Sequence, residues 1–391
     1  MKAPKYRCGQ RVTFKASMLA ACNSSSESGD IIYPMGSDNY LVRLLSNRSF
    51  AIVNETDITT EPEYTRRSNE KIRIVFFGNG DFAIPVLKSL LVAGHEVAAV
   101  VTSPNNSKRR DMRVSPTPVR EFAQEKGLYT LMPRELDSPK LIKKLRSLEP
   151  TLGVVADFKL LPPAVFNIPK WGTMNVHTSL LPQYRGASTV ASAIRDGETI
   201  TGLTTFIINE GIDRGNIINN FAVPILEGDN ALAVTNKLRL AAITMTDDAV
   251  QRLAHKVPLI PQEVLSCDYI FPCYAPKIHR KDCEIKWTDP AGKVYNFIRS
   301  ISPLPTAWTT FKPLNSSRTF TLKIFGAIPC DMGKGNHTSG HAFSEGKRLF
   351  IACRDGILEI ISLQKAGGRE LTAAEFINGF NGNVRGFCRL R

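Results

Sequence analysis

The chain has 391 residues, 43% of them hydrophobic, and its 50 Lys and Arg outweigh 36 Asp and Glu to give a formal net charge of +14 at pH 7. This length fits two domains of roughly 100–200 residues each, and the composition excludes collagen, wholesale disorder and a coiled coil. No apolar run approaches the roughly 18 residues that cross a bilayer, which predicts a soluble protein.

The positive charge is unevenly distributed. Residues 1–26 contain five basic residues and no acidic one, and residues 276–391 contain 18 Lys and Arg against 9 Asp and Glu. A basic C-terminal domain favours a polyanionic partner such as RNA, because neutralised phosphates release counterions. A basic surface that serves solubility alone is the alternative.

The eight cysteines are scattered, and none of them forms a C-x-x-C pair. In a chain of this size that pattern indicates buried thiols in a reducing compartment, and we expect neither a disulfide framework nor a metal site. The cysteines are Cys8, Cys22, Cys267, Cys273, Cys283, Cys330, Cys353 and Cys388.

The N-terminal 70 residues divide into two parts. Residues 1–26 are basic, acid-free and rich in Ser and Ala, which is typical of an organelle-import presequence, with a plain disordered terminus as the alternative. Residues 27–70 are polar and turn-rich, with a strand-like stretch at Asn39–Val53, and we assign no chemistry to this extension.

From Lys71 the pattern is an alternation of strands and helices, which predicts an α/β domain with a Rossmann-like, mostly parallel sheet over residues 71–260. Ligands bind such sheets at the carboxyl ends of the strands. The predicted strands are Ile72–Phe77, Glu96–Thr102, Thr151–Ala156, Gly172–His177 and Ile200–Ile207, and the predicted helices are Phe82–Ala93, Pro116–Lys126 and Ser138–Leu148.

Residues 261–283 read as a linker, and residues 284–391 as a second domain. After a helix at Ala291–Ser300, short strand candidates separated by Gly- and Asn-rich turns predict a small β-barrel. These candidates are Ala307–Phe311, Phe320–Ala327, Leu349–Ala352 and Leu358–Leu363.

Two loops at the predicted edge have alternative interpretations. Gly78–Ala83 fits the dinucleotide pattern G-x-G-x-x-A, but the second strand ends without the acidic residue that would hold a ribose, so NAD is not favoured. The loop after that strand carries four cations within six residues, which suits contact with a phosphate backbone. A solvated loop without a binding role is the alternative. The four cations are Lys108, Arg109, Arg110 and Arg113.

The pattern with the most chemical content is Asn175-Val-His177 at a strand end, followed by Asp213 in a later Gly-rich turn. Residues i and i+2 of a strand share a face. The Asn175 amide can donate a hydrogen bond to an oxyanion, and the neutral His177 imidazole can accept the proton of an attacking amine. Asp213 can orient or support His177. A structural strand end is the alternative for Asn175 and His177 alone.

The order of four motifs resembles the 10-formyltetrahydrofolate-dependent formyltransferases. These are F-F-G-x-x-x-F-A (Phe76–Ala83), N-V-H-x-S-L-L-P-x-Y-R-G (Asn175–Gly186), T-G-L-T (Thr201–Thr204) and G-I-D-x-G (Gly211–Gly215). The resemblance implies that Asn175, His177 and Asp213 are catalytic.

The second domain is similar to that of the methionyl-tRNA formyltransferase branch, through Trp287, Phe297–Trp308, Asp355–Gly367 and Leu371–Ala373. This implies an oligonucleotide-binding-like (OB-like) barrel that contacts tRNA, with Lys108, Arg109, Arg110 and Arg113 near the acceptor end. The folate pocket is implied to involve Ser179, Leu180, Leu181, Pro182, Asp157, Phe158 and Lys159. Of these, Asp157–Lys159 departs from the usual Ala-x-Gly or Ala-x-Phe-Gly pattern. Thr189 and Arg214 depart from the family pattern as well.

The function implied is formyl transfer from 10-formyltetrahydrofolate to methionyl-initiator-tRNA, without a metal, by a monomer in the mitochondrial matrix or, alternatively, a plastid. A formyltransferase for a small amine, such as an amino sugar or purine precursor, and a catalytically silent RNA-binding protein are the other interpretations. The basic second domain argues against the first and the retained triad against the second.

Overall fold

The computed structural model describes residues 71–104, 115–265, 272–314, 316–333 and 335–389, together with the backbone of five short strands between residues 11 and 60. Contacts divide the chain into two compact units. The first comprises Met1–Arg185, Ile200–Pro224 and Asn236–Tyr274, and the second Gly186–Thr199, Ile225–Thr235 and Ala275–Arg391. Within the described ranges, every helix is too short or too polar to cross a membrane.

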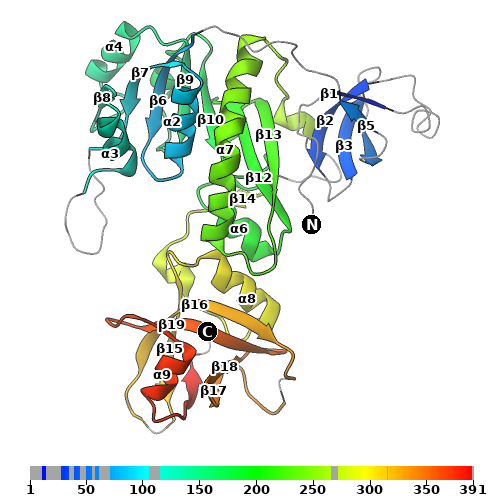
Figure 1. Ribbon diagram of the computed structural model, residues 1–391, viewed down its shortest axis with the longest axis vertical. Coiled ribbons are helices and arrows are strands. Elements are labelled where there is room, and N and C mark those ends of the chain that lie inside the picture. The colour runs from blue at the N-terminus through cyan, green and yellow to red at the C-terminus, as the bar shows by residue number, and fades with distance from the viewer. Residues whose placement is uncertain are drawn as a thin grey trace. The chain divides into compact units, whose positions relative to one another are not determined.

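A seven-stranded sheet forms the centre of the first unit, in the order β13-β12-β10-β9-β6-β7-β8 (Figure 1). The five strands from β10 to β8 are parallel. β12 is antiparallel to β10, and β13 is antiparallel to β12. This confirms the predicted Rossmann-like architecture. The strands are β6 (Arg73–Gly78), β7 (Glu96–Val101), β8 (Thr130–Leu131), β9 (Leu152–Ala156), β10 (Thr173–His177), β12 (Ile200–Ile207) and β13 (Ile217–Pro224).

Helices cover both faces of this sheet because its strands are apolar on both sides. Val75 and Phe77 of β6 pack in a cluster with side chains of α4 and α5, whereas Ile74 and Phe76, which alternate with them, are buried on the other face. The helices are α2 (Ala83–Val92), α3 (Pro118–Glu125), α4 (Pro139–Ser147), α5 (Pro163–Phe166) and α7 (Ala231–Ala254).

The second unit contains a closed antiparallel barrel, as predicted. Six strands follow the order β16-β15-β21-β17-β18-β19, and pairing of β16 with β19 closes the ring. Trp287 is fully buried in the core, and its indole N–H donates to Thr309 Oγ1 at 3.0 Å. The elements are α6 (Thr189–Asp196), α8 (Ala291–Ser300), β15 (Ala307–Pro313), β16 (Phe320–Cys330), β17 (His341–Glu345), β18 (Arg348–Ala352), β19 (Ile357–Lys365), β20 (Glu370–Thr372), α9 (Ala373–Asn378) and β21 (Arg385–Cys388).

The N-terminal segment contributes a separate antiparallel sheet of five strands, in the order β4-β3-β2-β1-β5. β1 pairs with both β2 and β5, so a strand from the presequence-like residues 1–26 lies inside this sheet. The strands are β1 (Arg11–Phe14), β2 (Ser28–Pro34), β3 (Asn39–Leu44), β4 (Phe50–Asn54) and β5 (Ile58–Thr60).

The remaining short elements lie in and near the predicted linker. They are β11 (Arg185–Gly186), which pairs with β14 (Tyr274–Ala275), and two 3-10 helices, η2 (Gln262–Leu265) and η3 (Arg280–Cys283). The stretch predicted to be a linker therefore contains ordered turns, and η2 belongs to the first unit.

Candidate active site

Asn175 and His177 lie on the same face of β10, at the carboxyl end of the parallel strands. In the neighbouring strand β12, Phe206 pairs with Asn175 and Thr204 pairs with His177. The His177 side chain is buried, with 8% exposed. The Asn175 amide is partly exposed and forms no hydrogen bond with any described residue, so it is available to a ligand.

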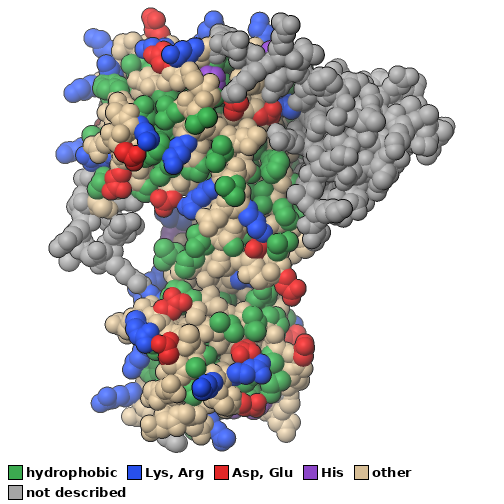
Figure 2. All heavy atoms as spheres, viewed as in Figure 1, with side chains coloured by type: hydrophobic (Ala, Val, Ile, Leu, Met, Phe, Trp, Pro, Cys, Tyr) green, Lys and Arg blue, Asp and Glu red, His purple; other side chains and the backbone are tan. Residues whose placement is uncertain are grey.

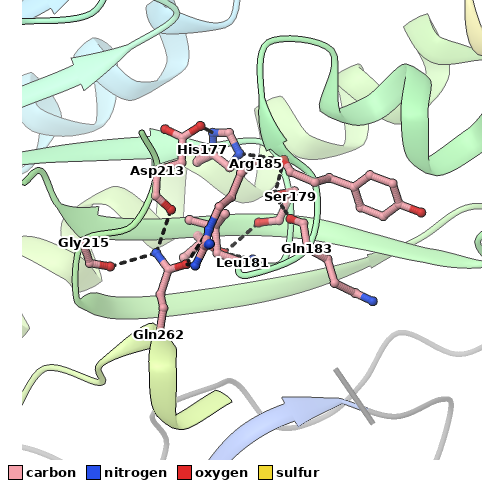
Figure 3. Close-up of polar contacts among 10 residues, drawn as sticks. His177, Ser179, Leu181, Gln183, Arg185, Asp213, Gly215 and Gln262 are labelled. Atoms are coloured by element: carbon pink, nitrogen blue, oxygen red, sulfur yellow. Dashed lines mark hydrogen bonds and ion pairs between the residues drawn. The ribbon is translucent and has the colours of Figure 1, made fainter. Parts of the chain in front are cut away.

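The hydrogen bonds of His177 fix where its proton lies. Nε2 is 3.1 Å from the carbonyl oxygen of Tyr184 (Figure 3). A carbonyl oxygen only accepts, so Nε2 carries the hydrogen, and in the neutral ring Nδ1 holds the free electron pair. Nδ1 is 3.9 Å from Asp213 Oδ2, and the Asp213 side chain is itself 13% exposed. The proton-accepting atom therefore faces a carboxylate that would stabilise the imidazolium.

The loop after β10 is held under His177 by buried polar contacts. Thr204 Oγ1 accepts from Leu181 N at 3.0 Å and donates to Ser179 O at 2.7 Å, and Ser179 Oγ donates to Gln183 O at 2.8 Å (Figure 3). The four residues of this loop predicted to bind folate, Ser179, Leu180, Leu181 and Pro182, are all buried.

We predict that Thr204→Val lowers the free energy of unfolding by about 1–3 kcal/mol, because the isosteric valine leaves Leu181 N and Ser179 O unpaired in a buried site. Thr201, three residues earlier on β12, is 3% exposed and its Oγ1 has no partner among the described residues. Thr201→Val is therefore the matched control, with an expected loss of about zero. Urea denaturation of both variants measures the difference, and equal losses would contradict the anchoring role of Thr204.

The turn that carries Asp213 approaches β12 very closely. A Cβ on Gly215 would lie 1.6 Å from the carbonyl oxygen of Ile207, so only glycine fits there. The exposed Arg214 guanidinium donates to Tyr274 Oη at 2.8 Å, and this hydrogen bond lowers the pKa of Tyr274. The Arg214 side chain is therefore engaged by Tyr274 at the surface.

Gln262 of η2 joins the two loops of the site, and no sequence pattern indicated it. Its Oε1 accepts from Arg185 Nη2 at 2.7 Å, and its Nε2 donates to the carbonyl oxygens of Asp213 at 2.9 Å and Gly215 at 2.8 Å (Figure 3). The Gln262 side chain is fully buried and Arg185 nearly so. One amide thus fixes the backbone of the Asp213 turn against the loop that follows His177.

We predict that Gln262→Leu lowers kcat by about tenfold to a hundredfold, since loss of the amide lets Asp213 move relative to His177 and small misplacements in a site have effects of this size. KM should change much less than kcat. The exposed Gln124 of α3 provides the control Gln124→Leu. A folded Gln262→Leu protein with unchanged kcat would show that Asp213 is positioned without it.

Asp157 lies directly after β9 at the same edge of the sheet, in the left-handed region with φ 48°. Its Oδ2 would be 1.8 Å from a Cβ on Gly80, so the carboxyl group packs directly over that glycine. Although the residue reaches solvent in part, desolvation of this carboxyl group raises the pKa of Asp157, and the nearby Asp81 adds to the rise. Phe158 packs toward Phe77, with ring centroids 5.9 Å apart.

Three of the seven described non-glycine residues with positive φ lie in the loops of this site. They are Asp157 (48°), Tyr184 (55°), whose carbonyl oxygen contacts His177, and Asp213 (52°), whose carboxylate faces the imidazole. The other four, Glu149, Lys256, Thr306 and Asn381, lie elsewhere in the chain, so positive φ is not confined to this site. Lys159 is exposed nearby in the chain. Lys108, Arg109, Arg110 and Arg113 lie outside the described residues.

Within the described ranges, no group of three or more His, Cys, Asp or Glu residues could hold a metal ion. The chemistry available at the edge is that of an amide donor, an imidazole base and a carboxylate.

Two family models match the chain. The formyl transferase model matches residues 71–250, and the model of the formyl transferase C-terminal domain matches residues 277–381. The methionyl-tRNA formyltransferase of Porphyromonas gingivalis strain W83 is 38% identical over 316 residues, which cover 80% of this chain and 96% of that protein. The enzyme of the same name from Parabacteroides distasonis is 36% identical over 314 residues, with the same coverage.

Solved structures share the fold at lower identity. HypX from Aquifex aeolicus, in complex with tetrahydrofolic acid, has a TM-score of 0.54 and 18% identity over 80% of this chain, which spans only 48% of HypX. WlaRD, a sugar 3N-formyl transferase, has a TM-score of 0.53 and 20% identity over 77% of this chain and 100% of its own length. The family models and the bacterial relatives together show that the chain belongs to the formyltransferase family, with methionyl-tRNA formyltransferases among its relatives.

Proposed function

We propose that this protein transfers a formyl group from 10-formyltetrahydrofolate to the α-amine of methionine esterified to initiator tRNA. The observation that carries the proposal is the meeting of Asn175, His177 and Asp213 at one sheet edge, with Nδ1 of the imidazole 3.9 Å from the carboxylate. Support for the substrates comes from relatives that are named methionyl-tRNA formyltransferase and that match this chain along nearly their whole length.

The three side chains suit the steps of acyl transfer. The amine attacks the formyl carbon and forms a C–N bond, while the Asn175 amide donates to the oxyanion of the tetrahedral intermediate. Nδ1 of His177 accepts the amine proton, and Asp213 stabilises the resulting imidazolium. Collapse of the intermediate breaks the bond from the formyl carbon to the donor nitrogen, and the imidazolium returns the proton to that nitrogen.

The choice of tRNA over a small amine rests on charge. Residues 276–391 carry an excess of nine positive charges, and Figure 2 shows Lys and Arg side chains spread over the visible face of the barrel unit. We propose that this unit, with Lys108, Arg109, Arg110 and Arg113, binds the tRNA phosphates. The folate donor would lie beside Asp157 and the backbone of Ser179–Pro182, which occupy the same edge as His177.

The decisive experiment supplies the full chain with 10-formyltetrahydrofolate and charged methionyl-tRNA, and measures formyl-methionine, with free methionine and His177→Ala as controls. Product formed only on tRNA, and lost in the variant, is the expected result. A protein that binds folate but formylates amino sugars or purine precursors and not tRNA would contradict the proposal in favour of a small-amine substrate.

We further propose that the protein acts in the mitochondrial matrix, supported by the acid-free, basic residues 1–26. Because β1 (Arg11–Phe14) pairs with two strands, removal of the whole segment would take a strand out of the N-terminal sheet. Fluorescent fusions of residues 1–26 and 1–70 test this: mitochondrial import of both supports the proposal, import of neither contradicts it, and plastid import of both favours the alternative.

A further inference from the structure

The barrel strands β17 and β18 carry apolar residues on both faces. Ala342, Leu349 and Ile351 belong to the main core of the barrel. Phe343 and Phe350, which alternate with them, form a separate small cluster. These two rings therefore lie on the outer side of the barrel wall, away from its core.

Three further rings extend this cluster into an aromatic stack, defined here as Phe350, Phe343, His337, His341 and Phe387. The centroids of Phe350 and Phe343 are 5.4 Å apart and those of Phe343 and His337 are 4.3 Å apart, with interplanar angles of 26° and 13°. His337 and His341 follow at 4.9 Å and 20°, and His341 and Phe387 at 5.2 Å and 43°. The first three pairs are spaced and oriented as in stacked aromatic pairs, whereas the ring of Phe387 is tilted against that of His341.

The two ends of the aromatic stack differ. At the Phe350 end, the guanidinium of Arg348 covers the ring at 4.9 Å and forms two hydrogen bonds with Glu359, at 3.0 and 2.5 Å, which closes this end. At the other end, Phe387 is 45% exposed. Arg385 stands two residues earlier on β21 and is also exposed, so an open ring and a cation share one side of a strand.

The two histidines present flat rings that are not both charged. His337 Nδ1 and His341 Nδ1 are 2.9 Å apart, so one of them donates and the other must keep its electron pair. Burial lowers the pKa of His341, and the charges of His337 and Arg385 lower it further. A neutral imidazole next to an open phenyl ring offers a stacking surface free of the hydration that a charged ring holds.

We propose that the open end of the aromatic stack, Phe387 backed by His341, stacks on an unpaired base of the tRNA substrate while Arg385 contacts a neighbouring phosphate. The proposal rests on the proposed function, because it takes tRNA as the polyanion that the excess of nine positive charges in residues 276–391 attracts. Rings that stack on bases beside cations that neutralise phosphates are the usual means of holding unpaired nucleotides.

The test measures the Kd of the full chain for methionyl-tRNA and the KM and kcat of formylation. Phe387→Ala is expected to raise Kd and the KM for tRNA about tenfold, the effect of losing one stacked base, with kcat at saturating tRNA unchanged. Phe387→Trp keeps a ring and should restore binding. Ile361→Ala on β19 is the matched control, because Ile361 is 44% exposed against 45% for Phe387.

Salt dependence separates the base from the phosphate. Loss of stacking in Phe387→Ala should weaken binding equally at every salt concentration, whereas Arg385→Gln should reduce the slope of log Kd against log salt by about one. The proposal is overturned if Phe387→Ala binds like the parent protein, if Ile361→Ala loses as much, or if Phe387→Trp fails to restore affinity. Absence of formylation by the parent protein would instead reject the proposed function, whatever the Kd values show.

Discussion

We expect His177→Ala to lower kcat for formyl transfer by about 10²–10⁴-fold, the usual contribution of a positioned general base. The reason is geometric: Nε2 is engaged with Tyr184 O, which leaves Nδ1 as the atom that takes the amine proton beside Asp213. Alanine removes this acceptor and with it the imidazolium that Asp213 would stabilise. Single-turnover kinetics with saturating methionyl-tRNA measure the effect on the chemical step alone.

The control for His177 is the exposed His279 at the start of η3, whose replacement by alanine should leave kcat within about twofold of the parent value. Binding of folate and tRNA should persist in His177→Ala. If His177→Ala retained more than a tenth of the parent kcat, the proton would have to leave by another route and the assignment of His177 would be wrong.

Asn175→Ala is expected to lower kcat by about 10²–10³-fold, the effect of removing one donor from an oxyanion site. Because the Asn175 amide has no partner among the described residues, its removal leaves no buried group unpaired, and stability should change little. Asn175→Asp tests whether the side chain acts as a hydrogen-bond donor, since the carboxylate keeps the shape of the side chain but repels an oxyanion. If Asn175→Asp stayed active, the proposed role of Asn175 would be contradicted.

The exposed Asn167, which follows α5, provides the matched control Asn167→Ala. Formylation kinetics at several methionyl-tRNA concentrations separate the two expected patterns: Asn175→Ala should lose kcat with little change in KM, because the charge on the oxygen exists only as the intermediate forms. A rise in KM alone would place Asn175 in ground-state binding.

The central sheet was predictable because its strands are buried on both faces. Runs such as Ile74–Phe77 and Leu152–Ala156 are almost wholly apolar, and such runs stand out in any sequence. Helix α7 was not predicted, because its buried side chains, among them Val234, Leu238 and Ala242, are interspersed with Thr and Asn. The strands β17 and β21 are short and carry His, Ser, Gly and Arg, so their pairing partners define them more than their composition does.

The sequence also predicted the candidate reacting groups but not the residue that holds them. Asn175 and His177 lie two residues apart on a strand, and Asp213 lies in a Gly-rich turn, so local chemistry sufficed to predict them. Gln262 contacts Asp213 and Arg185 across 49 and 77 residues of sequence. A glutamine has no spacing signature, and a role that depends on three-dimensional contacts of this kind becomes visible only in the folded chain.

The position of Gln262 extends the stretch of chain that holds the Asp213 turn in place beyond the matched catalytic domain. The match to the family's catalytic domain ends at residue 250, but the bridge of Ile217 with Ile260 and the whole of η2 (Gln262–Leu265) come later. A fragment truncated at the end of α7 would contain Asn175, His177 and Asp213, but its Asp213 turn would lack the two hydrogen bonds from Gln262. In a growing nascent chain, likewise, the hydrogen bonds of Gln262 to Asp213 and Gly215 can form only after this short helix has left the ribosome.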